Sequence, residues 1–206
     1  MFTGIVREVG QVLAISRPND TKIRLSCGWA PDSIEIGASI SCNGACLTVT
    51  ATGTTDATNW FEIDASDETL SKTTLGDWAN GSAINLEPAL KLGDELGGHI
   101  VSGHVDCVGE ITAIRPDAGS HRVSISMPRA LGRFVAPKGS ITVNGISLTV
   151  NEVEDTDEFT TFGVNIIPHT WAVTSLRDSA PGTRVNLEID LLARYVARLA
   201  EAAPVR

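Results

Sequence analysis

Two reactive side chains, the thiol of Cys46 and the hydroxyl of Ser147, stand at the same place in a stretch that the chain carries twice. Residues 39–49 read SISCNGACLTV and residues 140–150 read SITVNGISLTV, and seven of the eleven positions are identical. A thiol can supply a nucleophile, whereas a hydroxyl donates and accepts hydrogen bonds. The pattern therefore indicates two related sites with different chemistry. The alternatives are a buried thiol that acts as a small apolar side chain and an ordinary strand hydroxyl.

The repeat continues well beyond this stretch. Two further pairs of segments match in the same order, 4–15 with 103–114 and 73–90 with 174–191. Self-similarity over about a hundred residues indicates a duplicated domain, because solenoid repeats are only about 20–50 residues long. A glycine-rich, acidic joint at 92–98 separates the halves. The expected domains are 1–97, 98–189 and a tail at 190–206.

Each half reads as six short strands separated by clusters of Gly, Pro, Asn and Asp. The Asn-Gly pairs at 43–44 and 144–145 predict hairpin turns with positive φ. A short helical turn is expected in each half, at Thr69–Leu75 and Thr170–Leu176. The sequence thus predicts an all-β fold of two similar six-stranded closed barrels. The expected strands are Gly4–Ser16, Lys22–Cys27, Ser39–Cys42, Cys46–Thr52, Trp60–Ala65, Ala83–Leu86, Val105–Ile114, Val123–Met127, Ser140–Val143, Ser147–Val153, Phe159–Ile166 and Arg184–Ile189.

The tail has no counterpart in the first half. Residues Asp190 to Ala203 read DLLARYVARLAEAA, which predicts a C-terminal α-helix with Asp190 as its N-cap. An apolar stripe at helical spacing makes this helix amphipathic. The stripe either packs on its own barrel or holds copies of the chain together, and the pattern alone leaves both open. Its members are Leu191, Leu192, Tyr195, Val196 and Leu199.

Composition excludes several classes of function. The formal net charge is −9 and the pI is about 4.8, which argues against nucleic acid or an anionic membrane as the main partner. No secretory signal and no apolar run of about 20 residues is present, so a cytoplasmic protein is expected. The four cysteines form no C-x-x-C pair, which indicates reduced thiols, with no metal site and no disulfide framework.

Five motifs in order resemble the bacterial riboflavin synthases of the α-chain type. They are MFTGIV at the start, NGACLTV, GGHIVSGH at 97–104, KGSITVNGISLTV and VNLEID. The resemblance covers the chain from Met1 to the tail helix. It implies a homotrimer assembled through the C-terminal helices, with one 6,7-dimethyl-8-ribityllumazine in each barrel. It also places the productive site between the first barrel of one subunit and the second barrel of its neighbour.

The reaction that this resemblance implies is a dismutation. Two 6,7-dimethyl-8-ribityllumazine molecules exchange a four-carbon unit to give riboflavin and 5-amino-6-ribitylaminouracil, without cofactor or metal. Holding both molecules face to face removes an entropic cost of about 7–11 kcal/mol at best. The 7-methyl group is acidic because its carbanion delocalises into the ring. The protein must therefore supply positioning, modest acid–base help and a nucleophile or contact at C7.

The resemblance also assigns the catalytic positions. Cys46 is the nucleophile or a direct ring contact, His104 moves protons, and Lys138 stabilises developing anion where the first half has Ile36. The structural alternatives are a satisfied core histidine, a solvated lysine and a helix cap at Asp190. His99 is expected near the joint rather than in catalysis, and His121 in a solvated loop. The full catalytic set is Cys46, His104, Ser147, Thr149, Lys138 and Asp190.

The expected substrate wall is carried over from the same resemblance, with Phe2 as a stacking or apolar surface. Ala45 replaces a second cysteine found in some relatives, while Asn144 and His169 replace acids, which leaves the polarity of the second pocket open. The first barrel contributes Phe2, Thr3, Gly4, Ile5, Val6, Cys46, Leu47, Thr48, Asp64, Ala65, Ser66, Asp67, Glu68 and Thr69. The second contributes Gly103, His104, Val105, Lys138, Ser147, Leu148, Thr149, Asn165, Ile166, Ile167, Pro168, His169 and Thr170.

Two rival functions share parts of this pattern. Lumazine-carrying fluorescent proteins use the same double barrel without chemistry, but they lose site residues in one barrel and do not trimerise. A flavin-binding oxidoreductase barrel would be followed by a nucleotide-binding α/β domain with a glycine-rich turn. The intact Leu-Thr-Val frame in both halves and the tail helix favour the enzyme.

Overall fold

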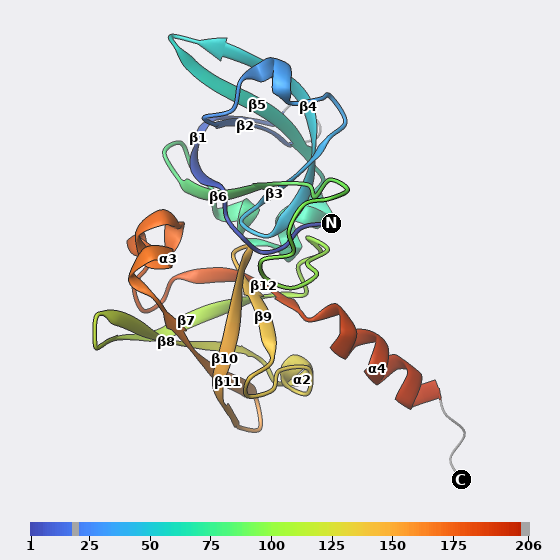
Figure 1. The fold of residues 1–206 in the computed structure, drawn as a ribbon, viewed down its shortest axis with the longest axis vertical. Coiled ribbons are helices and arrows are strands. Elements are labelled where there is room, and N and C mark those ends of the chain that lie inside the picture. Colours follow the sequence, from blue (N-terminus) through green and yellow to red (C-terminus); the bar gives the residue numbers. More distant parts are fainter. Residues whose placement is uncertain (18–20, 203–206) are drawn as a thin grey trace.

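The computed structural model describes residues 1–17 and 21–202 and consists of two β-barrels with a helix projecting from the second (Figure 1). The strands of the first barrel are antiparallel and close in the order β1-β2-β5-β4-β3-β6. They are β1 (Glu8–Ser16), β2 (Thr21–Ser26), β3 (Ser39–Cys42), β4 (Ala45–Thr55), β5 (Thr58–Ala65) and β6 (Ala83–Pro88). Its short helices are η1 (Pro31–Ser33), α1 (Asp67–Lys72) and η2 (Thr74–Asp77).

The second barrel repeats this topology, closing in the order β10-β11-β8-β7-β12-β9. Its strands are β7 (Cys107–Asp117), β8 (Ser120–Pro128), β9 (Ser140–Val143), β10 (Ile146–Asp155), β11 (Phe159–Ile166) and β12 (Arg184–Ile189). Its helices are α2 (Arg129–Gly132), α3 (Pro168–Val173), η3 (Ser175–Asp178) and the terminal α4 (Leu191–Ala202). The predicted fold class, two six-stranded closed barrels and a C-terminal helix, is confirmed.

Alternation of apolar and polar residues explains why these segments form barrel strands. In β2 every second residue, from Thr21 to Leu25, is buried, as expected for strands with one face toward a core. Phe61 and Ile63 of β5 fill the first barrel, and Phe162 and Ile125 fill the second. Each core belongs to one barrel, so each half has its own apolar interior.

The two Asn-Gly turns meet back to back where the barrels touch. All four turn residues have positive φ, as predicted, with Asn43 at 46° and Asn144 at 46°. A Cβ on Gly44 would lie 2.8 Å from the amide nitrogen of Gly145, so the close approach of the turns also requires glycine. The side-chain amide of Asn85 donates to the carbonyl of Asn144 at 2.9 Å. Asn144 is therefore buried in the barrel contact, where its side-chain oxygen accepts a hydrogen bond from the amide of Asn186 at 2.8 Å.

Several predicted bounds are wrong, and the reason is tertiary. β1 begins at Glu8 rather than Gly4, and β7 begins at Cys107 rather than Val105, because the residues before them run between the barrels. Each predicted helical turn is two short helices, broken at an extended residue, Thr73 or Thr174. The short helices η1 and α2 were not predicted.

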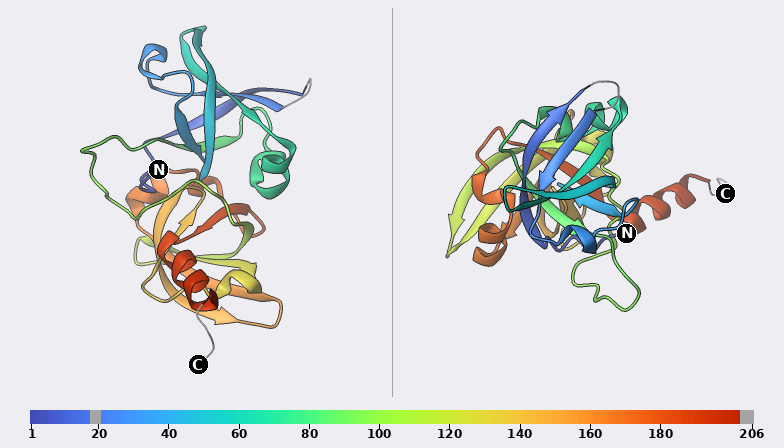
Figure 2. Two further views of the ribbon diagram at one scale, coloured as in Figure 1. Left: turned by 90° about the vertical axis from the view of Figure 1, so that its right-hand side faces the viewer. Right: turned by 90° about the horizontal axis from the view of Figure 1, so that it is seen from above.

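The tail forms a helix that projects from the second barrel and is joined to it by the ion pairs Arg194–Asp106 and Arg133–Glu201 (Figures 1 and 2). Asp190 Oδ1 accepts a hydrogen bond from the amide of Leu192 at 2.9 Å, which confirms the predicted cap. Ala203 lies outside the described residues. Packing of the stripe on its own barrel is wrong for four of its five members, which are 60–71% exposed. The four exposed members of the stripe are Leu192, Tyr195, Val196 and Leu199.

No helix in the described ranges is long and apolar enough to cross a membrane.

Candidate active site

The segments that precede β1 and β7 lie side by side between the barrels. The amide of Phe2 donates to the carbonyl of Val101 at 2.8 Å, and the amide of Val101 donates back at 3.1 Å. Phe2 is fully buried. This two-way bridge brings residues nearly a hundred positions apart to one place, and it sets the geometry of both hairpins.

Ser147 on β10 sits under the first of these segments. Its amide donates to the carbonyl of Gly4 at 2.8 Å, and its Oγ lies 2.7 Å from Nδ1 of His99. Nε2 of the same imidazole lies 3.2 Å from Oγ1 of Thr142, which faces Ser147 across the β9–β10 pair. The structure thus brings His99 into contact with the second hairpin. The sequence had indicated a place near the joint and no part in catalysis.

The electrostatic setting of His99 favours a neutral ring. Burial lowers the pKa of this imidazole below its ordinary value, and the carboxylate of Asp190 partly opposes the shift. A neutral imidazole carries one N–H donor and one acceptor nitrogen. His99 can therefore exchange a proton with the Ser147 hydroxyl while Thr142 holds the other side of the ring.

Cys46 on β4 sits under the second segment in the equivalent way. Its amide donates to the carbonyl of Gly103 at 2.8 Å, and its side chain is half-buried beside Ser41 on β3. A Cβ on Gly103 would lie 2.6 Å from the Cβ of Cys46, so the contact leaves no room for a larger residue. His104, the next residue, is exposed. Each reactive hairpin is thus capped by the segment that leads into the other barrel.

Two buried glutamates, which sequence reasoning missed, hold these segments in place. Glu87 of β6 accepts hydrogen bonds from the amide and hydroxyl of Thr3, at 2.7 and 2.8 Å, and from the amide of Gly4 at 3.0 Å. Glu188 of β12 accepts the matching three bonds from Ser102 and Gly103, at 2.7, 2.6 and 2.9 Å. The signal was an Asn-Leu-Glu triplet repeated in two strands that are otherwise buried and apolar.

Burial dominates the electrostatics of both glutamates. It raises the pKa of Glu87, while the bonds from Thr3 and Gly4 and the nearby Arg7 lower it. Burial also raises the pKa of Glu188, the bonds from Ser102 and Gly103 lower it, and the neighbouring Asp106 has the smallest effect, which raises it. Both carboxylates are under 5% exposed, and each accepts three donors on two oxygens. Such a cluster is stable because every donor is satisfied.

Lys138 occupies a backbone conformation that is uncommon for a side-chain residue. Its φ is +67°, and its amide donates to the carbonyl of Val150 at 2.8 Å. Gly37, with φ +89°, makes the same bond to Val49 in the first barrel. The counterpart of Lys138 is therefore Gly37 and not Ile36. The lysine side chain is exposed, so at this position the second barrel carries a cation where the first has a glycine.

The predicted wall residues 64–69 and 165–170 lie at equivalent places on the two barrels, at the ends of β5 and β11 and on the short helices that follow. Some have local structural partners: Asp64 pairs with Lys22 at 2.8 Å, and Ser66 caps α1 by accepting from the amide of Thr69 at 3.2 Å. Ile167 is 55% exposed. Thr48 and Thr149, one on each hairpin, are also exposed.

The expectation that His121 is a solvated loop residue is wrong. It lies on β8, half-buried, with its ring stacked on Trp171 at 3.9 Å between centroids and 10° between planes. Pro168 starts α3, and α3 lays Trp171 over the strand. His121 therefore anchors α3, on which the predicted wall residues His169 and Thr170 lie.

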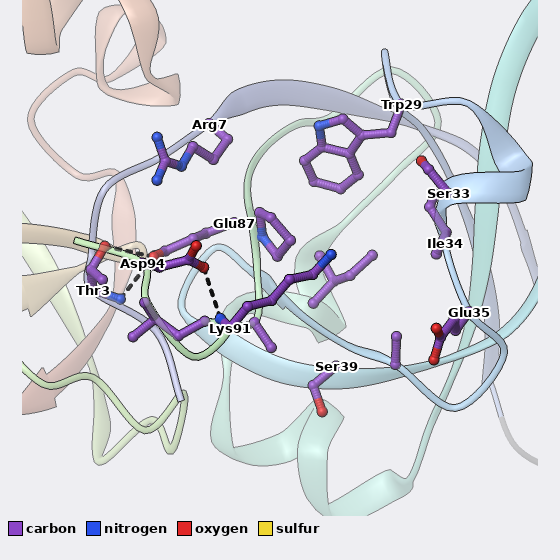
Figure 3. Close-up of a pocket in the computed structure, with 15 residues that line it drawn as sticks. Thr3, Arg7, Trp29, Ser33, Ile34, Glu35, Ser39, Glu87, Lys91 and Asp94 are labelled. Carbon is purple, nitrogen blue, oxygen red and sulfur yellow. Dashed lines mark hydrogen bonds between the residues drawn. The ribbon is translucent and has the colours of Figure 1, made fainter. Parts of the chain in front are cut away.

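A cavity of about 590 Å³ opens beside the first barrel, between β6, η1 and the joint (Figure 3). Thr3, Arg7, Trp29, Ile34, Glu87 and Lys91 are among its lining residues. Of the predicted substrate wall only Thr3 reaches it, and neither Cys46 nor Ser147 lines it. Within the described ranges no group of three or more His, Cys, Asp and Glu side chains could hold a metal ion.

Comparison with known proteins gives a consistent picture. A family model described as a lumazine-binding domain matches twice, at residues 3–89 and 102–190. The chain is 43% identical to a riboflavin synthase of Brucella abortus (strain 2308), over 98% of each chain. It is 44% identical to a riboflavin synthase of Mycobacterium tuberculosis (strain H37Rv), over 98% of this chain and all of that one.

Solved structures agree. The crystal structure of LumP complexed with riboflavin superposes with a TM-score of 0.75 at 26% identity, covering 92% of this chain and 99% of that one. LumP complexed with 6,7-dimethyl-8-(1'-D-ribityl) lumazine gives a TM-score of 0.73 at 26% identity, covering 91% and 98%. The same double-barrel scaffold thus holds both ring systems in LumP.

Proposed function

Because the chain belongs to the riboflavin synthase family, we propose that it converts two 6,7-dimethyl-8-ribityllumazine molecules into riboflavin and 5-amino-6-ribitylaminouracil by transfer of a four-carbon unit. The observation that carries this proposal is the pairing of two lumazine-binding repeats whose hairpins present different reactive groups, Cys46 and Ser147. A reaction between two copies of one molecule needs two similar cradles that treat their occupants differently.

Each barrel binds one lumazine in this proposal, against its reactive hairpin and the end of β5 or β11. The first cradle uses Cys46 and Thr48, and the second uses Ser147 and Thr149, with the wall residues named above around them. LumP, whose double barrel superposes on this chain, binds both the lumazine and riboflavin. The domains proposed for these roles are 1–97 and 98–189, with 190–206 as the tail.

Acid–base work falls to the second hairpin in this proposal. His99, held by Thr142, moves the proton at Ser147, and Asp190 stabilises the charged imidazole. Positioned acid–base groups of this kind contribute about 10²–10⁴-fold to a rate. Lys138 faces the ring from the edge of the same region. His104 follows Gly103, which binds the first hairpin, and there Cys46 contacts the ring directly.

We propose that the enzyme is a cytoplasmic homotrimer assembled through α4, with each productive site between the first barrel of one subunit and the second barrel of its neighbour. Exposed apolar side chains on α4, such as Leu192 and Leu199, support assembly, since a helix face of this kind is stabilised by a partner. Thr48 and Thr149 both stand on exposed faces, which supports a site closed by a second copy.

The test is turnover of purified protein with 6,7-dimethyl-8-ribityllumazine alone. Flavin absorbance is expected to rise, with one riboflavin and one 5-amino-6-ribitylaminouracil formed for every two lumazines consumed. A protein that binds the compound tightly but leaves its spectrum unchanged over hours would be a lumazine carrier and would contradict the proposal.

A further inference from the structure

We infer that Glu87 and Glu188 are positioning residues for this reaction, and that each one fixes the reactive hairpin of the opposite barrel. The inference rests on the proposed function for its kinetic consequence and on the geometry alone for the rest. Neither carboxylate touches a reactive side chain directly. Each acts through the backbone segment that it holds, here called the clamped segment, which is residues 3–4 for Glu87 and residues 102–103 for Glu188. Each of these segments passes from one barrel to the other.

The first clamp starts at Glu188 in the second barrel and ends at Cys46 in the first. Glu188 binds the amides of Ser102 and Gly103 together with the Ser102 hydroxyl. The same hydroxyl accepts from the amide of His104 at 3.3 Å, and the carbonyl of Gly103 accepts from the amide of Cys46 at 2.8 Å. One carboxylate therefore sets both His104 and the thiol.

The second clamp runs the opposite way, from Glu87 in the first barrel to Ser147 in the second. Glu87 binds Thr3 and Gly4, and Figure 3 shows Glu87 bonded to Thr3. The carbonyl of Gly4 accepts from the amide of Ser147 at 2.8 Å, and the carbonyl of Thr3 accepts from the amide of His99 at 3.2 Å. Glu87 therefore sets the hydroxyl and the imidazole beside it.

The chemistry of the clamp requires a carboxylate. Each glutamate meets three donors with two acceptor oxygens, so an isosteric glutamine would turn an N–H₂ group toward a backbone N–H. That mismatch loosens the clamped segment but leaves the side chains of the substrate site in place. The charged groups around the clamps differ, since Arg7 faces Glu87 and Asp106 faces Glu188. Asp106 is itself paired with Arg194 of α4 at 2.7 Å, so the first clamp, which starts at Glu188, is tied to the tail helix.

The experiment compares Glu188→Gln, Glu87→Gln and a matched control, Glu8→Gln, in the full-length protein. Glu8 is a half-buried strand glutamate that also accepts a backbone amide, but its carboxylate bonds to Gly28 at 3.0 Å and not to either clamped segment. Iodoacetamide labelling mapped by peptide mass reports on Cys46. Its rate is expected to rise several-fold in Glu188→Gln and to stay unchanged in Glu87→Gln and Glu8→Gln.

The reciprocal readout is the NMR titration of His99, assigned with a His99→Gln variant. Its pKa is expected to move up toward the ordinary value in Glu87→Gln, because a loosened Thr3 carbonyl exposes the ring. It is expected to stay unchanged in Glu188→Gln and in the control. These two readouts need no turnover, so they test the clamps even if the proposed reaction is wrong.

Kinetics complete the test. Both clamp variants are expected to lose about 10²-fold in kcat with a smaller change in KM, since misplacing reacting groups by about 1 Å has that effect. Should Glu188→Gln fail to fold, Ser102→Ala removes one donor and is expected to shift Cys46 labelling in the same direction. Equal effects of both variants on both readouts, or effects no larger than those of Glu8→Gln, would overturn the inference.

Discussion

The two barrels share one topology and one pattern of clamps, yet they carry different chemical groups around the reactive hairpin. The first presents the thiol of Cys46, and its counterpart to Lys138 is a glycine. The second presents Ser147 with His99 and Asp190 close by, and it also bears α4. Duplication thus preserved the scaffold, while the proposed proton-transfer pair of Ser147 and His99 and the projecting helix α4 both lie on the second half. The comparison teaches that the asymmetry the reaction needs lies in a few side chains rather than in the fold.

Removing α4 should have the largest effect, because only the second barrel carries a terminal helix. Deletion of residues 191–206 is expected to give monomers in sedimentation analysis and to abolish most turnover, since the proposed site spans two subunits. The substitution Leu199→Asp should act in the same direction, whereas Arg198→Ser, on an exposed residue outside the apolar stripe, should leave assembly intact. A monomer with full activity would contradict the shared site.

Gly103→Ala should be the most damaging single change near the first hairpin. The new Cβ would lie 2.6 Å from Cys46 and must also adopt a φ of +80°. Gly119→Ala is the matched control, because its φ is +93° and nothing lies within 4 Å. Overpacking should cost about 1–3 kcal/mol more at Gly103 than at Gly119 in denaturant unfolding. Equal losses of unfolding free energy at Gly103 and Gly119 would mean that the segment around Gly103 shifts to accommodate the new Cβ.

The two hairpins should respond differently to side-chain exchange. Ser147→Ala is expected to lower kcat by about 10²–10⁴-fold, because His99 loses the group with which it exchanges protons. Cys46→Ser, which gives the first barrel the hydroxyl of the second, is expected to retain most activity in steady-state kinetics, since the thiol acts as a contact. A loss for Cys46→Ser as large as for Ser147→Ala would assign the thiol a covalent role.

The pH dependence of stability and of kcat/KM should show the smallest of these effects, and it tests the role of His99. Its pKa is lowered in the folded chain, so the stabilisation from its neutral form is present above the ordinary value of 6.5 and is lost as pH falls through the folded pKa. An acid limb in kcat/KM is therefore expected below pH 6.5. Asp190→Asn should shift that limb to still lower pH, because Asp190 raises the pKa of His99. A shift to higher pH would contradict this assignment.

The fold was readable from the sequence because its signals are local. Alternation, the Asn-Gly pairs and the repeat fixed the strands and hairpins, and residue spacing placed the tail helix. The clamps were not readable, since Glu87 meets Thr3 across 84 positions and Glu188 meets Ser102 across 86. For the same reason His99, close in sequence to the joint, gave no hint of its contact with Ser147. Local sequence patterns identify strands and helices. A site assembled from segments that cross between the barrels can be identified only once the packing of those segments is known.

The most direct test of the account is complementation between two inactive variants. Thr48→Trp fills the cradle of the first barrel and Thr149→Trp fills that of the second, and both positions are exposed, so folding should be spared. Each variant alone should be inactive, and co-expression should restore activity, up to roughly a quarter of the sites in randomly mixed trimers. Co-expressed variants that remain inactive, with mixed trimers shown by native mass spectrometry, would contradict a site shared between neighbouring chains.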